Sequence, residues 1–119
     1  MIEASCHCGS IRIELARKPR TLTACNCSIC RRYATLWAYY RASDVRMHRP
    51  RGSTSSYAWG DRSIRFVRCG HCGCVTHWEA AKGSASARLG INARNLDPGV
   101  LKGIRVRRLD GAGTWKYLD

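Results

Sequence analysis

Hydrophobic side chains come in short runs along this chain, and the clearest run alternates with polar residues. Isoleucine or leucine occupies positions 11, 13 and 15, with a polar residue at each position between them. This period of two predicts a half-buried strand over residues 11–15. Residues 2–5 precede it across a turn at 6–10, where Gly9 can adopt unusual backbone angles. We therefore expect a β-hairpin whose turn carries two cysteines.

The remaining apolar runs are equally short and are separated by turn residues. They predict further strands at residues 21–24, 36–41, 55–59, 63–68, 75–79, 87–91 and 104–107. Residues 42–46 are expected to form a turn, and residues 115–118 to pack back on the sheet. Many short strands with little helix indicate a mainly β fold of short antiparallel sheets.

One or two short helices are expected between these strands. Ser28 is the predicted N-cap of one or two helical turns that run to Tyr33. Asp97 and Pro98 are of the types that favour an N-cap and the first helical position. The 119 residues contain no repeat and no linker, so a single domain over residues 1–119 is expected.

Basic residues dominate the charge of the chain. There are 21 Lys and Arg against 8 Asp and Glu, which gives a formal net charge of +13. Such a surplus indicates anionic ligands: a carboxylate-bearing small molecule, an acidic protein or nucleic acid. Residues 1–5 lack the features of a secretory signal, and no apolar run is long enough to span a membrane. The expected location is therefore the reducing cytoplasm, with no membrane association.

Cysteine spacing is the most informative feature of the sequence. Seven of the eight cysteines fall into three clusters, which are Cys6/Cys8, Cys25/Cys27/Cys30 and Cys69/Cys72. C-x-C and C-x-x-C spacings suit thiolates that converge on one metal ion and give poor geometry for disulfides between neighbours. In a reducing compartment this pattern predicts zinc, with two Zn²⁺ ions per chain.

The simplest partition gives four ligands to one zinc and three to the other. The four, Cys6, Cys8, Cys69 and Cys72, would close a tetrahedral structural site that ties two hairpins together. The other three, Cys25, Cys27 and Cys30, would leave the fourth coordination position of their zinc open, and a reaction could take place there. The other partition has two four-coordinate structural sites, and it needs Cys74 or a histidine as the extra ligand.

These motifs, taken in order, resemble the glutathione-dependent formaldehyde-activating enzyme family, which shares a domain with centromere protein V. The resemblance is carried by C-H-C-G at 6–9, C-x-C-S-x-C-R-R at 25–32 and C-x-x-C-G at 69–73, and it extends through residues 95–98 to Trp115. It implies a β-tent zinc fold with a structural four-cysteine zinc and a second zinc on the middle cluster. It also implies a carbon–sulfur lyase activity, in which glutathione adds to formaldehyde to give S-hydroxymethylglutathione.

The chemistry of a three-thiolate zinc agrees with that activity. Its net charge near −1 suits an exchangeable fourth thiolate from a substrate, and zinc keeps such a sulfur nucleophilic at neutral pH. Cys25, Cys27 and Cys30 are therefore the predicted catalytic centre, where a small thiol such as glutathione attacks a small aldehyde. Arg31 and Arg32 either grip a substrate carboxylate or are solvated surface residues.

Several roles stay open at this point. His48 and His77 are acid–base candidates, with a structural or surface role as the alternative. Cys74 is a buried free thiol, a spare ligand or a redox-sensitive neighbour. The strongest rival function is a non-catalytic basic zinc module that binds acidic partners or nucleic acid, although no nucleic-acid motif is present. A third is zinc storage or redox sensing by the open cysteines.

Overall fold

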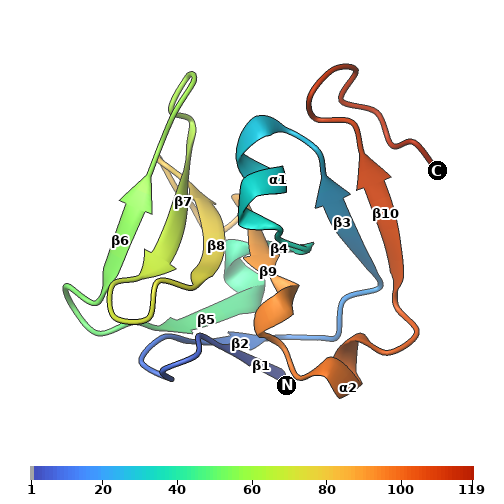
Figure 1. Cartoon of the computed structure of the whole chain (residues 1–119). Helices are drawn as coiled ribbons and strands as arrows, with labels where there is room; N and C mark the ends of the chain where they lie inside the picture. Colours follow the sequence, from blue (N-terminus) through green and yellow to red (C-terminus); the bar gives the residue numbers. More distant parts are fainter. Residues whose placement is uncertain (1) are drawn as a thin grey trace.

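Ten β-strands in two sheets, with two short α-helices, make up the fold of residues 2–119, which a computed structural model describes (Figure 1). This confirms the mainly β fold that the hydrophobic pattern predicts. The strands are β1 (Ile2–Ser5), β2 (Arg12–Leu15), β3 (Thr21–Cys25), β4 (Trp37–Arg41), β5 (Val45–His48), β6 (Thr54–Tyr57), β7 (Ile64–Cys69), β8 (Val75–Ala80), β9 (Arg88–Asn92) and β10 (Arg105–Leu109). The α-helices are α1 (Ser28–Tyr33) and α2 (Pro98–Leu101). Neither helix of this described part of the chain has the length and apolar character needed to cross a membrane.

The smaller sheet contains the predicted N-terminal hairpin and one strand that the sequence pattern does not reveal. Its order is β1-β2-β5, and both pairings are antiparallel. The turn expected over residues 42–46 ends at Asp44, and β5 begins at Val45. Only Val45 and Met47 mark this strand, opposite Leu15 and Ile13 of β2. Two apolar positions are too few to establish a period of two.

The larger sheet has seven strands in the order β10-β3-β4-β9-β8-β7-β6. Of its strand pairs within residues 2–119, β10 and β3 are the parallel one, with Arg105 opposite Thr21, and the others are antiparallel. The structure therefore differs from the expected antiparallel pairing at this edge. Parallel neighbours need a long connection, and here most of the chain lies between the two strands.

The two helices begin in different ways. Asp97 caps α2 as predicted, because its side chain accepts a hydrogen bond of 2.8 Å from the backbone N–H of Gly99. In α1, however, the N-cap is Cys27, which makes no side-chain cap hydrogen bond, and Ser28 is the first helical residue. The predicted cap is therefore wrong by one residue. This shift places the sulfur of Cys27 at the junction between β3 and the helix.

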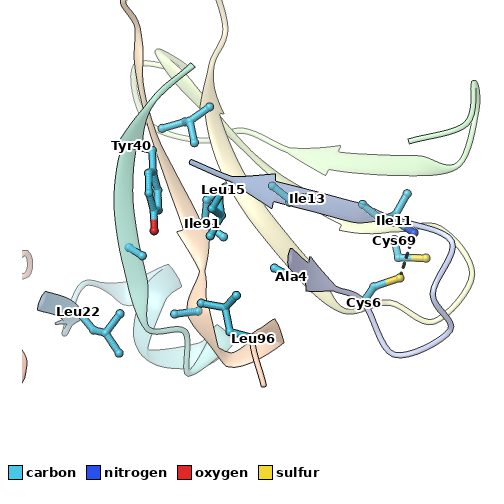
Figure 2. Packing of buried hydrophobic residues seen from close by; sticks show 13 residues of the cluster. Ala4, Cys6, Ile11, Ile13, Leu15, Leu22, Tyr40, Cys69, Ile91 and Leu96 are labelled. Carbon is cyan, nitrogen blue, oxygen red and sulfur yellow. Dashed lines mark hydrogen bonds between the residues drawn. The ribbon is translucent and has the colours of Figure 1, made fainter. Parts of the chain in front are cut away.

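Apolar side chains lie on both faces of the larger sheet. In β4, Ala38 and Tyr40 join the main core, whereas Trp37 and Tyr39 belong to the cluster on the opposite face. The main core lies between the two sheets, and Figure 2 shows side chains of the N-terminal hairpin there beside Ile91 and Tyr40 of the larger sheet. The opposite face packs against α1 through a second cluster, whose buried members are Cys27, Cys30, Trp37 and Phe66.

A polar network is buried on β8. His77 is fully buried, and its Nε2 lies 2.7 Å from the Glu79 carboxylate, which also accepts hydrogen bonds from Arg49 and Arg65 at 2.9 Å. Burial opposes ionisation of Glu79, but the hydrogen bonds from His77, Arg49 and Arg65 outweigh it and hold the pKa of this carboxyl well below its usual range. Burial lowers the pKa of His77, which favours the neutral imidazole. The Thr76 hydroxyl lies 2.9 Å from its Nδ1.

We expect Glu79→Ala to destabilise the metal-loaded protein by about 1–3 kcal/mol, because it removes the carboxylate beside Nε2 of the buried His77 and leaves two arginines without their partner. The matched control is Glu3→Ala, which breaks the exposed pair with Arg12 at 3.6 Å and is expected to cost less than about 0.5 kcal/mol. Urea denaturation measures the free energy of unfolding of both variants. Equal effects of the two substitutions would contradict a structural role for the Glu79 network.

Candidate metal centres

Four cysteines from two turns meet at the end of the main core. Cys6 and Cys8 lie in the turn between β1 and β2, whereas Cys69 ends β7 and Cys72 follows it. Their sulfur atoms all lie within 4.8 Å of one another, with 3.7 Å between Cys6 and Cys8 and 3.6 Å between Cys8 and Cys69. A tetrahedral zinc with Zn–S bonds of 2.3 Å needs sulfurs about 3.8 Å apart. The donor set and its spacing therefore fit one zinc ion.

Hydrogen-bond donors surround these four sulfurs. The backbone N–H of Ile11 donates to Cys6 at 3.3 Å (dashed in Figure 2), and the N–H of His71 donates to Cys69 at 3.4 Å. The Ser10 hydroxyl, 3.2 Å from Cys69, and backbone N–H groups lower the pKa of that thiol to about 7. Backbone N–H groups also lower the pKa of Cys72 to about 6. The site is therefore built to hold thiolates, although burial raises the pKa of Cys6.

The second cluster lies on the opposite face of the larger sheet, where β3 gives way to α1. Cys25 ends β3, Cys27 caps the helix and Cys30 lies one turn later, so the three sulfurs converge within 4.8 Å. Among residues 2–119, no other histidine, cysteine or carboxylate joins this group. The Trp37 indole N–H donates to the Cys30 sulfur at 3.3 Å, and the Cys27 N–H donates to Cys25 at 3.5 Å.

Burial makes this second cluster dependent on a cation. Burial raises the pKa of Cys25 and of Cys30 above the usual value, although the Trp37 N–H partly offsets it at Cys30. At Cys27 the N–H groups of the first helical turn outweigh burial and lower the pKa. Three thiolates in this position therefore need the charge of a metal ion. Three sulfurs with no fourth ligand from residues 2–119 fit a zinc ion with one open position.

The chain after β10 covers the three-cysteine cluster, a contact that the sequence pattern does not predict. Asn26 donates to the Asp110 carboxylate at 3.0 Å and accepts from the Ala112 N–H at 2.9 Å. In Figure 1 this C-terminal segment curls beside the turn between β3 and α1. A β-carbon on Gly111 would lie 2.5 Å from the Cys25 sulfur. The one sequence signal for this approach is the glycine itself.

A cavity of about 350 Å³ opens on the three sulfurs. All four tryptophans of the chain line it, although they are spread over the sequence from 37 to 115. Trp37 and Trp78 come from β4 and β8, Trp59 from the turn between β6 and β7, and Trp115 from the C-terminal segment. A group that enters this cavity reaches all three cysteines.

The other predicted site residues lie outside this cavity. Arg31 and Arg32 are exposed on α1 and do not line it, and Arg32 donates instead to the Ser28 carbonyl at 2.7 Å. His77 lies on the opposite face of β8 from Trp78, and His48 pairs with Glu14 at 2.9 Å in the smaller sheet. Neither histidine is placed for proton transfer at the sulfurs.

Two groups of residues lie outside both clusters: the eighth cysteine and a set of basic side chains. All eight cysteines are free, and Cys74 belongs to neither sulfur cluster. Five of the basic residues line two surface hollows that share Tyr39 and Tyr40. They are Arg17, Lys18, Arg20, Arg41 and Arg88.

The two clusters are expected to bind two zinc ions with different consequences for the fold. Cys27→Ser should lose one zinc and leave the domain folded, because the four-cysteine site is intact. Cys72→Ser should cost about 4 kcal/mol or more, because zinc binding there joins the two hairpins. Elemental analysis and urea denaturation check both variants. Equal loss of stability in Cys27→Ser and Cys72→Ser would contradict the division into an open and a structural site.

Acidification should release zinc from the three-cysteine cluster first. Metal binding needs thiolates, so a raised thiol pKa lets protons displace the metal at a higher pH. In the three-cysteine cluster the pKa values of Cys25 and Cys30 are raised and that of Cys27 is lowered, whereas in the four-cysteine cluster those of Cys69 and Cys72 are lowered and that of Cys6 is raised. A chelator dye that follows zinc release from pH 8 downwards should show two steps, and Cys27→Ser should lack the one at higher pH. If Cys27→Ser instead lacks the step at lower pH, the predicted order of zinc release is wrong.

Comparison with known proteins agrees with this geometry. The sequence model of the glutathione-dependent formaldehyde-activating enzyme family matches residues 1–103. A crystal structure of a Rhodobacter sphaeroides protein is similar at 29% identity with a TM-score of 0.71, over 88% of this chain and 99% of that one. The family match stops before β10 and Trp115. The chain belongs to the glutathione-dependent formaldehyde-activating enzyme family.

Proposed function

We propose that this protein is a zinc-dependent enzyme that forms and cleaves a carbon–sulfur bond, in which a substrate thiol adds reversibly to a small aldehyde. One observation carries the proposal: three cysteine sulfurs converge beside a cavity, and no fourth protein ligand within residues 2–119 joins them. A structural zinc site would be closed by a fourth ligand from the protein. Here the ligand that completes the site can come from the cavity.

In this proposal the four-cysteine cluster has a purely structural role. Cys6 and Cys69 are buried at 4% and 1% exposure in the main core, and none of the four cysteines lines the cavity at the other cluster. The cluster joins the β1–β2 turn to the β7–β8 turn, so zinc would fix the two sheets relative to each other.

A zinc ion on Cys25, Cys27 and Cys30 would lower the pKa of a thiol at its open position and keep that sulfur nucleophilic. The protein supports this chemistry through its own residues. The Trp37 N–H donates to the Cys30 sulfur and draws negative charge away from the site. The aromatic walls of the cavity would reduce the contact of the reacting sulfur with water.

The proton balance of the reaction needs one acid near the new hydroxyl group. The thiol loses a proton on binding, its sulfur attacks the carbonyl carbon, and the resulting alkoxide takes up a proton to give a hydroxyalkyl thioether. Tyr39 is the hydroxyl group that we assign to this step. It lines the cavity, and burial raises its pKa to about 12, so it stays protonated at neutral pH.

The name of the family indicates which reactants to test first, glutathione and formaldehyde. We place the protein in a reducing compartment, the cytoplasm, because all eight cysteines are free and seven of them are proposed metal ligands. Carbon–sulfur lyase activity is the reverse of the same step, since cleavage of the adduct returns the thiol and the aldehyde.

The test measures exchange between free thiol, aldehyde and adduct by NMR, with the zinc-loaded protein at catalytic concentration. Cys27→Ser should reduce the enhancement of the exchange rate by about 10²-fold or more, because it removes the site that activates the thiol. Cys74→Ser is the matched control, since this cysteine belongs to neither cluster, and it should keep the full rate. A wild-type protein with two zinc ions and no rate enhancement for any thiol would contradict the proposal.

A further inference from the structure

The cavity beside the three-cysteine centre is built almost entirely from apolar and aromatic groups. Besides its four tryptophans, Phe66, Ile29, Ile64 and Leu109 line it. Trp37 is buried at 1% exposure, whereas Trp59 and Trp115 are 45% and 68% exposed at the opening. Gly90 of β9 leaves the space that the Trp78 indole fills, because a β-carbon there would collide with it. Such a wall favours an apolar ring or a branched alkyl group.

The charges around the cavity also favour an uncharged ligand. The chain carries 21 Lys and Arg, yet within residues 2–119 none of them lines this cavity. The charged side chain at its edge is Asp61, whose pKa is lowered by hydrogen bonds from Ser63 and which is therefore ionised. Glutathione has two carboxylates and one ammonium group. Inside the cavity its carboxylates would lose water, meet no cation and lie near the carboxylate of Asp61.

The C-terminal segment after residue 103, which lies outside the family match, supplies part of this wall. Leu109 and Trp115 both line the cavity. Trp115 has a φ of 60°, a backbone conformation that aromatic residues rarely adopt, and its N–H donates to the Asp110 carbonyl at 2.8 Å. The Asn26 side chain holds the same turn through Asp110 and Ala112. The exposed face of the indole is thus fixed at the opening, where an organic group can cover it.

We propose that the thiol taken by this centre is uncharged and carries an apolar organic group, an aryl or branched alkyl substituent, and that Trp115 determines this preference. The proposal rests on the function proposed above and names its substrate class. The sulfur of such a thiol lies at the three cysteines while its substituent fills the tryptophan-lined cavity. The bond that forms is still the one between this sulfur and the aldehyde carbon, and the proton balance is unchanged.

Direct binding tests the substrate class without an activity assay. The four tryptophans line the cavity, so their fluorescence reports its occupancy, and cobalt in place of zinc reports sulfur ligation through its thiolate charge-transfer absorption. We would titrate the zinc-loaded protein and the cobalt-loaded protein with phenylmethanethiol and with glutathione. Phenylmethanethiol is expected to bind about tenfold or more tightly than glutathione, since its ring removes apolar surface from water.

Variants in one segment provide the control. Trp115→Ala should weaken phenylmethanethiol by about fivefold or more and leave glutathione unchanged, because only the ring contacts the indole. Leu118→Ala is the matched substitution: Leu118 is 56% exposed in the same segment and does not line the cavity, so it should alter neither affinity. Asp61→Lys should improve glutathione binding relative to the wild type, because it replaces a carboxylate with a cation.

The possible failures are distinguishable. If glutathione binds as tightly as phenylmethanethiol, or if Trp115→Ala weakens both thiols equally, the apolar substrate class is wrong while the proposed function stands. If no thiol changes the cobalt absorption of a protein that holds two metal ions, the proposed function fails and the substrate class fails with it. If phenylmethanethiol quenches the tryptophans but leaves the cobalt spectrum unchanged, the ring binds without its sulfur, and the apolar substrate class is wrong.

Discussion

Four cysteine sulfurs, two from each of two turns, meet at one point, and the placement of one sheet on the other depends on this meeting. The smaller sheet has three short strands, and the cluster of Cys6, Cys8, Cys69 and Cys72 joins its β1–β2 turn to the end of β7 in the larger sheet. Sulfurs 3.6–3.7 Å apart are in the arrangement that a tetrahedral metal requires. A chain of 119 residues gains from such a bond, since its apolar core is small.

The three-cysteine centre depends on that frame, but it lies on the other face of the larger sheet. Alternate side chains of β4 point to opposite faces of the larger sheet. Tyr40 packs in the main core, whereas Trp37 and Tyr39 line the cavity. The same sheet therefore carries the main core on one side and the three-cysteine cluster with its cavity on the other. A zinc ion at the first centre would hold the sheet rigid, so that the second could remain open toward a ligand.

The sequence predicts the features that depend on local pattern. The structure has the predicted hairpin of β1 and β2 and the predicted Asp97 cap, and it groups the seven cysteines as in the simpler of the two partitions. β5 and the parallel partnership of β10 with β3 escape prediction, because pairing between distant segments leaves little local trace. The face of β8 that carries His77 could not be assigned for the same reason. Arg31 and Arg32 follow the cysteines directly in sequence, yet the helix turns them away from the cavity.

Recognition of the cavity required the structure, because its tryptophans come from four separate segments. The central claim concerns the ligand that completes the three-cysteine zinc. X-ray absorption at the zinc edge, measured with a selenol in place of the thiol, tests it most directly, using phenylmethaneselenol and the selenium analogue of glutathione. The account predicts a zinc–selenium shell of about one selenium for two zinc ions with at least one of the selenols, and no such shell in Cys27→Ser. A zinc environment of protein sulfur alone with both selenols would contradict it.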